Sequence, residues 1–395
     1  MNQPLFLHIV ERLESFLGKL PATIQKPVLQ ELTPLKELFL KQRAPRFVLT
    51  GSHKFPAQEV VATLFAVPQP GDLRDVLMEV FRWQNTEAGG HGAVALLDAR
   101  GADEPALRKI EEELRRQPAD IFLHLVDGSS ARPILARDTG NLSAVLAFNH
   151  LPGTRSKVVG ISIVAPAKAD GDRSGAQQKL QTALSERPGI REHLTRVCEL
   201  PLATMDLATT AGTDPRTARF MALLARELPN EARVEMIRIS RDRQAQIEIA
   251  QILVKSTSAI SAAVGAQPIP LADLPILTTL QLVMVSGIMY IAGRERSLRA
   301  ATEFVAALGV NVGAGMVLRE GARAVLKFFP GWGNVVCGMV AGAGTYALGR
   351  AAIVYFLEGV TLKDARRIYL TSRKRRARPK LLKATVEGKP DVPAT

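Results

Sequence analysis

Residues 46–58 read Arg46-Phe47-Val48-Leu49-Thr50-Gly51-Ser52-His53-Lys54-Phe55-Pro56-Ala57-Gln58, and the class of fold can be worked out from this stretch. The apolar run from Phe47 to Thr50 predicts a buried strand. A glycine-containing turn follows, and the apolar spacing of residues 59–67 predicts a helix. A strand that leads through a short turn into a helix begins a βαβ unit, so the stretch predicts an α/β domain.

Short apolar runs and helical stretches keep alternating up to residue 165. We expect further strands at residues 76–83, 93–97, 121–126, 144–148 and 157–164. A glycine-rich turn is expected at residues 85–92, and a charged helix that begins at a proline is expected at residues 105–117. Strands that are apolar at every position are buried on both faces. The pattern predicts a mainly parallel sheet with helices on both faces.

The segments outside residues 46–165 predict helices and no strand. We expect two amphipathic helices in residues 1–45, a helical connector in residues 166–262, an apolar helical domain in residues 263–370 and a basic, disordered tail in residues 371–395. The predicted fold is therefore an α/β domain followed by an all-α apolar domain.

Two apolar segments of the helical domain, Leu271–Ala292 and Asn334–Leu357, are each long enough to span a bilayer. Arg350 would cost about 2.5–3.5 kcal/mol near the middle of a membrane helix. Glycines in the second segment allow close helix packing, at Gly338, Gly342 and Gly349. These features fit either a membrane hairpin or a tight soluble bundle.

The formal net charge of +13 is concentrated near the C-terminus, where residues 363–383 hold ten Lys or Arg against one Asp. Such a cluster beside apolar helices binds anionic lipid. We expect membrane or anion contacts at Arg373, Lys374, Arg375, Arg376 and Arg378. Aromatic residues make up only 5% of the chain, too few for stacking single-stranded nucleic acid, so nucleic acid is not an expected partner.

Cysteine and histidine give no pattern typical of a metal or disulfide site. Cys198 and Cys337 are far apart in the sequence, and the six histidines lack helical ligand spacing with acidic residues. We therefore predict no metal site. The first residues lack the basic region and continuous apolar run of a secretory signal, so we expect a cytoplasmic location.

The turn after the first predicted strand matches a phosphate-binding loop at one position. A working loop has Gly, four residues, then Gly-Lys and Ser or Thr. Gly51 occupies the first position, and the other three hold Pro56, Ala57 and Gln58. Proline removes an N–H donor, alanine has no charge, and glutamine lacks the hydroxyl that holds Mg²⁺. Lys54 comes three residues too early to reach the phosphates unless the loop is remodelled.

The surroundings of this loop resemble Era-type bacterial GTPases, which have a mainly parallel P-loop sheet with helices on both faces. Residues 43–51 are similar to the first strand of that family, and residues 120–127 resemble a later strand. Leu96-Leu97-Asp98-Ala99-Arg100-Gly101 resembles the family's Asp-x-x-Gly motif, in which Asp supports Mg²⁺ and Gly senses the γ-phosphate. Asp98 at the end of a strand is also typical of an ordinary cap or turn residue.

Ala147-Phe148-Asn149-His150-Leu151-Pro152 stands where the family has its guanine-reading Asn-Lys-x-Asp motif. Asn149 matches, but His150 and Pro152 replace the Lys and the Asp, and Asn149 also fits a plain turn before a proline. Residues 71–74, at the place of switch I, contain no Thr. The resemblance thus implies vestigial nucleotide-binding positions at Gly51, Lys54, Asp98, Gly101 and Asn149.

The apolar half of the chain closely resembles the helical domain of unknown function typified by YcjF, which often follows Era-like GTPase domains. The resemblance rests on residues 267–284, on Phe329-Pro330-Gly331-Trp332-Gly333 and on residues 341–350. Together the two resemblances cover nearly the whole chain apart from its last dozen or so residues.

These observations favour a non-catalytic, GTPase-derived scaffold or regulatory protein on the cytoplasmic face of the inner membrane. We expect no catalytic residues and no cofactor; the expected partners are anionic lipid and, through the helical domain, a protein partner or a second copy. A rival hypothesis is an NTPase that binds GTP and Mg²⁺ with an unusual loop and uses Lys54. A third is nucleic-acid binding through the basic tail.

Overall fold

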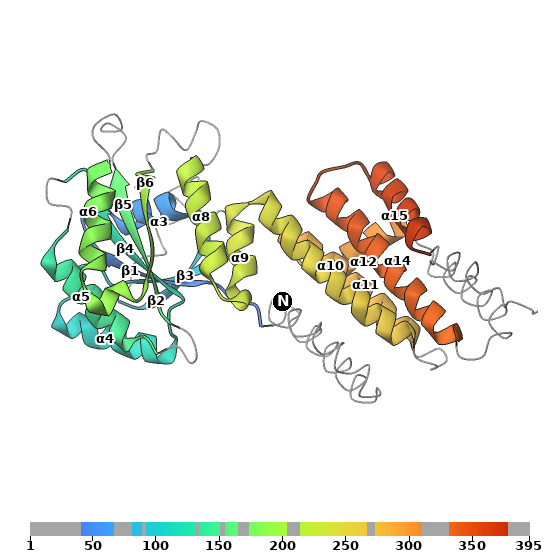
Figure 1. Cartoon of the computed structure of the whole chain (residues 1–395), viewed down its shortest axis with the longest axis horizontal. Coiled ribbons are helices and arrows are strands. Elements are labelled where there is room, and N and C mark those ends of the chain that lie inside the picture. Colours follow the sequence, from blue (N-terminus) through green and yellow to red (C-terminus); the bar gives the residue numbers. More distant parts are fainter. Residues whose placement is uncertain are drawn as a thin grey trace, which may run out of the picture. The chain divides into compact units, whose positions relative to one another are not determined.

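The computed structural model describes residues 41–66, 81–88, 92–130, 134–150, 155–164, 174–203, 214–266, 273–309 and 332–377. The chain divides into two compact units, which are treated separately below (Figure 1). Lys41–Asp242 form an α/β unit, and Arg243–Thr395 with Met1–Leu40 form a helical unit. The helices predicted in residues 1–40 lie outside the described residues, as do switch I and the last eighteen residues.

The α/β unit is built on a six-stranded sheet with the order β2-β3-β1-β4-β5-β6. Its strands are β1 (Arg46–Gly51), β2 (Trp83–Ala88), β3 (Gly92–Asp98), β4 (Ile121–Asp127), β5 (Lys157–Val164) and β6 (Leu194–Pro201). Only β2 runs antiparallel to its neighbour, and the other pairs are parallel. The predicted fold class, a mainly parallel sheet with helices on both faces followed by a helical region, is confirmed.

Helices cover both faces of this sheet because successive strand residues point to opposite sides. On one face, Val48 and Phe122 join a core with the helices α4 (Glu104–Arg116), α5 (Ala136–Phe148), α6 (Ser174–Ser185) and α7 (Pro188–Arg191). On the other, Phe47 packs against Phe65 with ring centroids 5.5 Å apart. This second face carries α3 (Ala57–Phe65), α8 (Pro215–Glu227) and α9 (Asn230–Ser240).

Three local predictions for the α/β unit were wrong. Residues 85–88 belong to β2 rather than to a turn, because the buried Thr86 and Ala88 alternate with polar residues. Residues 144–148 end helix α5 and are not a strand, since a five-residue apolar run fits either structure. The predicted helical connector, residues 166–262, contains the strand β6. Its charged residues interrupt the apolar pattern, although Val197 and Leu200 are buried.

The helical unit contains long apolar helices in close contact. Its described helices are α10 (Arg243–Gly265), α11 (Asp273–Ile291), α12 (Leu298–Ala307), α14 (Trp332–Phe356) and α15 (Leu362–Ala377). A Cβ atom added at Gly338 would lie 2.5 Å from the carbonyl oxygen of Ala262, and one at Gly342 would lie 2.8 Å from the Cβ atom of Ala262. The glycines of α14 therefore allow α10 to approach closely, as their small size predicts.

Within the described part of the chain, α10 is the one helix long and apolar enough to cross a membrane by length and composition. Just over half of its most apolar stretch, 56%, is buried inside the structure, and a core helix of a soluble protein can be equally long and apolar. The apolar segment Leu277–Ile291 within α11 is shorter. Whether the two segments predicted from the sequence enter a bilayer stays a prediction.

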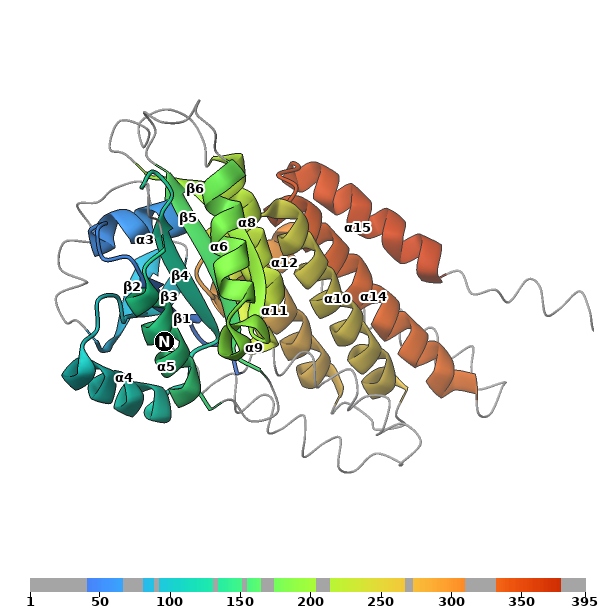
Figure 2. The same ribbon diagram turned by 60° about the vertical axis from the view of Figure 1, so that its left-hand side comes forward.

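Helix α15 begins with a capped first turn and continues through Ala377. The disordered tail predicted to start at residue 371 was therefore wrong for residues 371–377, because the charged sequence at this end of the helix has no apolar periodicity of its own. Figure 2 shows α15 beside α14, the helix it packs against.

Candidate functional site

The carboxyl ends of β1, β3 and β4 meet at one edge of the sheet and bring four of the predicted residues together. Gly51 ends β1 with φ of 92°, a conformation that favours glycine. A Cβ atom at this position would overlap the carbonyl oxygen of Leu125 on β4. Gly51 is therefore required by the close pairing of β1 with β4, whether or not a ligand is bound.

The loop from Ser52 to Pro56 leads directly into α3, as in the βαβ pattern expected from the sequence. The backbone N–H of Ser52 donates to the carbonyl of Leu125 at 2.8 Å, and Pro56 precedes α3 without a side-chain cap. The Lys54 side chain is 59% exposed, and its Nζ lies 3.3 Å from Oδ2 of Asp127 at the end of β4. This exposed ion pair is weak, since solvent screens it.

Arg100 connects the Asp-x-x-Gly motif to the loop. Its Nε and Nη2 donate to the two carboxylate oxygens of Asp98, each at 2.8 Å. Its Nη1 donates to the carbonyl oxygen of Phe55 at 2.8 Å and also contacts that of Ser52 at 3.5 Å. The Arg100 side chain is only 4% exposed. The bidentate pair and the loop carbonyls thus use all the hydrogen-bonding nitrogens of a buried guanidinium.

This arrangement differs from what phosphate binding requires. A phosphate cradle points backbone N–H groups and a lysine at the anion, and its Asp-x-x-Gly aspartate supports Mg²⁺. Here two loop carbonyls point to a cation, and both oxygens of Asp98 are bonded to Arg100. We call these three elements, the Asp98 carboxylate, the Arg100 guanidinium and the carbonyls of Ser52 and Phe55, the arginine lock.

Gly101 and the first turn of α5 complete the carboxyl edge. Gly101 has φ of 67°, and a Cβ atom there would lie 3.6 Å from the His53 ring. Burial raises the pKa of the Asp138 carboxyl on α5, while His53 and Arg137 act in the opposite direction. At this edge Lys54 thus faces the carboxylate of Asp127, and Arg100 faces that of Asp98.

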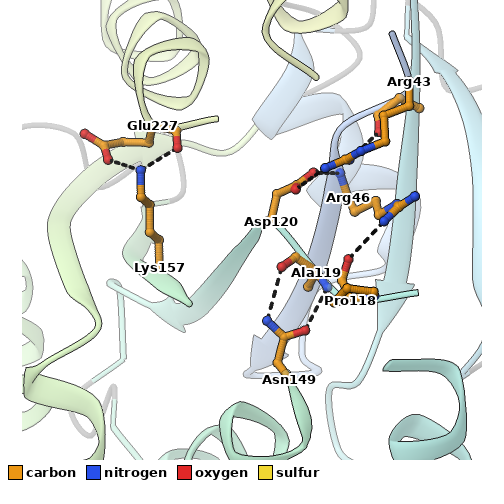
Figure 3. Close-up of polar contacts among 9 residues, drawn as sticks. Arg43, Arg46, Pro118, Ala119, Asp120, Asn149, Lys157 and Glu227 are labelled. Carbon is orange, nitrogen blue, oxygen red and sulfur yellow. Dashed lines mark hydrogen bonds and ion pairs between the residues drawn. The ribbon is translucent and has the colours of Figure 1, made fainter. Parts of the chain in front are cut away.

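Asn149 lies at the opposite, amino edge of the sheet and does not join the other four predicted residues (Figure 3). Its amide oxygen accepts from the N–H of Ala119 at 2.8 Å, and its Nδ2 donates to the carbonyl of Ala119 at 3.1 Å and to Oγ of Ser156 at 2.9 Å. The side chain is buried, so every donor and acceptor is used in holding α5 to the start of β4. The guanine-motif position assigned to Asn149 was wrong, while the alternative of a turn residue fits.

The error came from taking residues 144–148 as a strand. The strand that lies after α5 is β5, which ends at Val164. In the sequence, Ala167-Lys168-Ala169-Asp170 follows this strand and shares the Lys and the Asp of Asn-Lys-x-Asp. These four residues lie outside the described part of the chain, so the match is one of sequence order alone.

His124 is a buried titratable group in the middle of the sheet. Its Nδ1 lies 3.1 Å from Oγ1 of Thr50, the residue opposite it on β1. Complete burial lowers the pKa of His124 to about 4, so the imidazole is neutral at physiological pH. In the described ranges no group of three or more His, Cys, Asp or Glu side chains could hold a metal ion.

The basic residues predicted to contact a membrane fall partly on α15. The helix backbone includes Arg373, Lys374, Arg375 and Arg376, and Arg378 lies outside the described residues. The basic stretch of residues 363–383 also includes Lys363, Arg366 and Arg367, which are exposed earlier in the same helix and for which no contact was predicted from the sequence. The i, i+3, i+4 spacing of these three residues is the signal that identifies them as one helical face.

The fold is an α/β unit with a six-stranded, mostly parallel sheet, joined to a helical unit. No sequence profile of a known protein family matches the chain. The chain is similar to magnetosome membrane protein 22 of Magnetospirillum gryphiswaldense, with 29% identity over 132 residues. The match covers 31% of this chain and 66% of the relative, just under two thirds of its length.

Proposed function

We propose that this chain is a non-catalytic, GTPase-derived scaffold or regulatory protein associated with the cytoplasmic face of the inner membrane. The arginine lock is the observation that carries the proposal. A buried guanidinium bonds both Asp98 oxygens and two loop carbonyls at the edge where the resembled family holds phosphates and Mg²⁺. We accordingly expect neither GTP nor Mg²⁺ as a cofactor and assign no catalytic residue.

The sequence of the loop supports the same conclusion independently. Pro56 and Ala57 supply neither the N–H nor the charge that a phosphate needs, and Gln58 supplies no hydroxyl for Mg²⁺. Lys54, the nearest lysine, forms its ion pair with Asp127. The Era-type and YcjF-type resemblances give this reading its family context.

Three observations support the membrane part of the proposal. The relative from Magnetospirillum gryphiswaldense is named a membrane protein. Helix α10 has the length and composition of a membrane-crossing helix. The basic residues predicted for anion contact provide an attraction to acidic lipid, at Arg373, Lys374, Arg375, Arg376 and Arg378.

A protein partner or a second copy would bind through the helical unit. Met339 and Val340 are adjacent large apolar residues of α14 that remain substantially exposed. Exposed apolar side chains next to each other on a helix suit a protein contact. Nucleic acid stays the third and least favoured partner.

A second candidate function is weak guanine-nucleotide binding. It is favoured by Lys168 and Asp170, which follow β5 in the order of the family's guanine-reading motif. Under this alternative Lys54 leaves Asp127 and contacts the phosphates, so Lys54→Ala abolishes binding. Lys109→Ala, on the exposed surface of α4, is the matched control.

Calorimetric titration of the full chain with GTP, with and without Mg²⁺, tests the proposal. We expect no binding heat and no hydrolysis in either condition. Micromolar affinity together with Mg²⁺-dependent hydrolysis that Lys54→Ala removes would establish the alternative. Retention of the chain on cell membranes after a carbonate wash would indicate integration, whereas its release would indicate association with the surface.

A further inference from the structure

Helix α15 has one face packed against the helical unit and one face exposed. Ala365 and Tyr369, four residues apart, are buried where α15 packs against α14. On the other side, Lys363 and Arg367 are exposed, and Leu370 is 45% exposed. Arg366 is exposed at the flank of the helix, where its Nη2 would lie 3.1 Å from a Cβ atom added at Gly309. We call Lys363, Arg366, Arg367 and Leu370 the outer face of α15.

The charge of α15 is strongly one-sided. Its sixteen residues contain one acidic residue, Asp364, and seven basic residues, namely Lys363, Arg366, Arg367, Arg373, Lys374, Arg375 and Arg376. Asp364 accepts a 2.7 Å hydrogen bond from Oγ1 of Thr361, and its own N–H donates to the same oxygen at 3.2 Å. The acid is therefore part of a reciprocal cap at the helix start.

The three basic residues of the outer face have no ion-pair partner among the described residues. By contrast, α4 also has an exposed polar face, but its arginines form i, i+3 and i, i+4 pairs with Glu104, Glu111 and Glu113. The positive field of α15 is thus not neutralised within the helix, whereas that of α4 is.

We propose that the outer face of α15 docks on the headgroups of anionic lipid, with Leu370 entering the boundary between headgroups and acyl chains. This inference rests on the membrane part of the proposed function and makes it specific. It moves the start of the contact from residue 373 back to Lys363, onto a helix that is already folded. Because the helix need not form on binding, no ordering of this segment opposes the association.

Lipid fits the outer face better than nucleic acid does. Tyr369 is the aromatic residue of α15, and its side chain is buried against the helical unit, so it cannot stack on a base. An exposed leucine amid basic residues instead matches interfacial helices, which combine electrostatic attraction with a buried apolar side chain.

The test is sedimentation of the full chain with vesicles of phosphatidylcholine alone and of phosphatidylcholine mixed with phosphatidylglycerol. Wild type should bind the mixed vesicles, and salt should weaken the binding. The combined variant K363Q/R366Q/R367Q should bind on the order of 100-fold more weakly, since each charge contributes about fivefold. Leu370→Gln should weaken binding about fivefold and leave its salt dependence unchanged.

The control variant removes three positive charges from α4 by R108Q/K109Q/R116Q, at residues that are also exposed. It should bind within about twofold of wild type. Circular dichroism of all variants checks that they are folded. Equal losses in the α4 and α15 variants would overturn the inference, because binding would then follow net charge rather than this helix.

Two other outcomes separate this inference from the proposed function. If wild type binds the mixed vesicles and the α15 variant binds equally well, the inference fails and membrane association stands. If wild type binds no vesicles under any salt condition, both fail. Tighter α15-dependent binding to random-sequence duplex DNA than to mixed vesicles would overturn the choice of lipid.

Discussion

Each of the two edges of the sheet contains a bidentate arginine–carboxylate pair, but the two pairs have different roles. At the amino edge, Arg43 forms a bidentate pair with Asp120 at 2.6 and 2.7 Å, and the backbone N–H of Arg46 donates to the same carboxylate at 2.9 Å (Figure 3). At the carboxyl edge, Arg100 pairs with Asp98 in the same bidentate way. An arginine–carboxylate pair at the amino edge joins parts of the fold, whereas at the carboxyl edge it occupies the place expected for a ligand.

The two pairs also differ in solvent exposure. The Asp120 side chain is 2% exposed, and that of Asp98 is 19% exposed. Removing the partner of a carboxylate lowers the free energy of unfolding less when water can reach the carboxylate. The comparison therefore predicts that breaking the pair at the amino edge lowers the free energy of unfolding more. Breaking the pair at the carboxyl edge should mainly change the conformation of the loop from Ser52 to Pro56.

The largest expected effect is at the amino edge. Arg43→Ala should lower the free energy of unfolding by about 3–4 kcal/mol, because it leaves the buried Asp120 carboxylate, only 2% exposed, without its bidentate partner. Urea denaturation followed by circular dichroism measures the loss. A loss below about 1 kcal/mol would show that the two edges do not differ in this way.

The next effect concerns His124, on the strand that extends between the two edges. The pKa of His124 is lowered from 6.5 to about 4 in the folded state, so the unfolded chain takes up a proton first as the pH falls. The contribution of the neutral His124 to the free energy of unfolding is therefore fully present above pH 6.5. It should decline by about 3 kcal/mol as the pH approaches 4.

Unfolding free energies of wild type and His124→Gln, measured across this pH range, check the prediction. The variant should be less stable at neutral pH, since Thr50 loses its imidazole partner, but it should show a shallower decline in acid. An identical decline in both proteins would assign the acid sensitivity to other groups.

The smallest effect on stability is expected at the carboxyl edge. Arg100→Ala should lower the free energy of unfolding by about 1–2 kcal/mol, because water can reach Asp98 in part. The same change should speed hydrogen exchange of the amides in residues 52–55, since the carbonyl oxygens of Ser52 and Phe55 lose the guanidinium that holds the loop.

Arg100→Lys provides the matched control for charge. Lysine keeps the positive charge but cannot bond both Asp98 oxygens and the loop carbonyls in a planar fork, so it should restore the exchange rates only in part. Unchanged exchange in Arg100→Ala would mean that the lock does not hold the loop.

The sequence alone predicts those strands and helices whose own residues show a clear apolar pattern. Phe47 to Gly51 and the helix that follows them are recognisable because every strand residue after Arg46 is buried. By contrast, β6 presents only two fully buried apolar residues, Val197 and Leu200, within a run that includes Arg196 and Glu199. A strand at the edge of a sheet needs few apolar residues, so its pattern is faint.

In the candidate site, too, features within one short segment could be predicted from the sequence, whereas contacts between distant segments could not. Pro56, Ala57 and Gln58 show from the sequence that the phosphate loop has lost its working residues. What replaces them could not be deduced, because the bonds of Arg100 to Ser52 and Phe55 join residues more than forty positions apart. Asn149 was misplaced for a related reason, since a motif is assigned to an edge only when the strand before it is known.

The arginine lock also bears on whether the conformation of this domain can respond to a nucleotide. A bound nucleotide is a ligand whose occupancy follows its concentration in the cell, and the resembled family changes shape in response to one phosphate group. Arg100 belongs to the chain, so its effective concentration at the loop is constant and does not vary with cellular metabolites. Under the proposed function the domain presents one permanent shape, and any timing in its action comes from when and where its partners meet it.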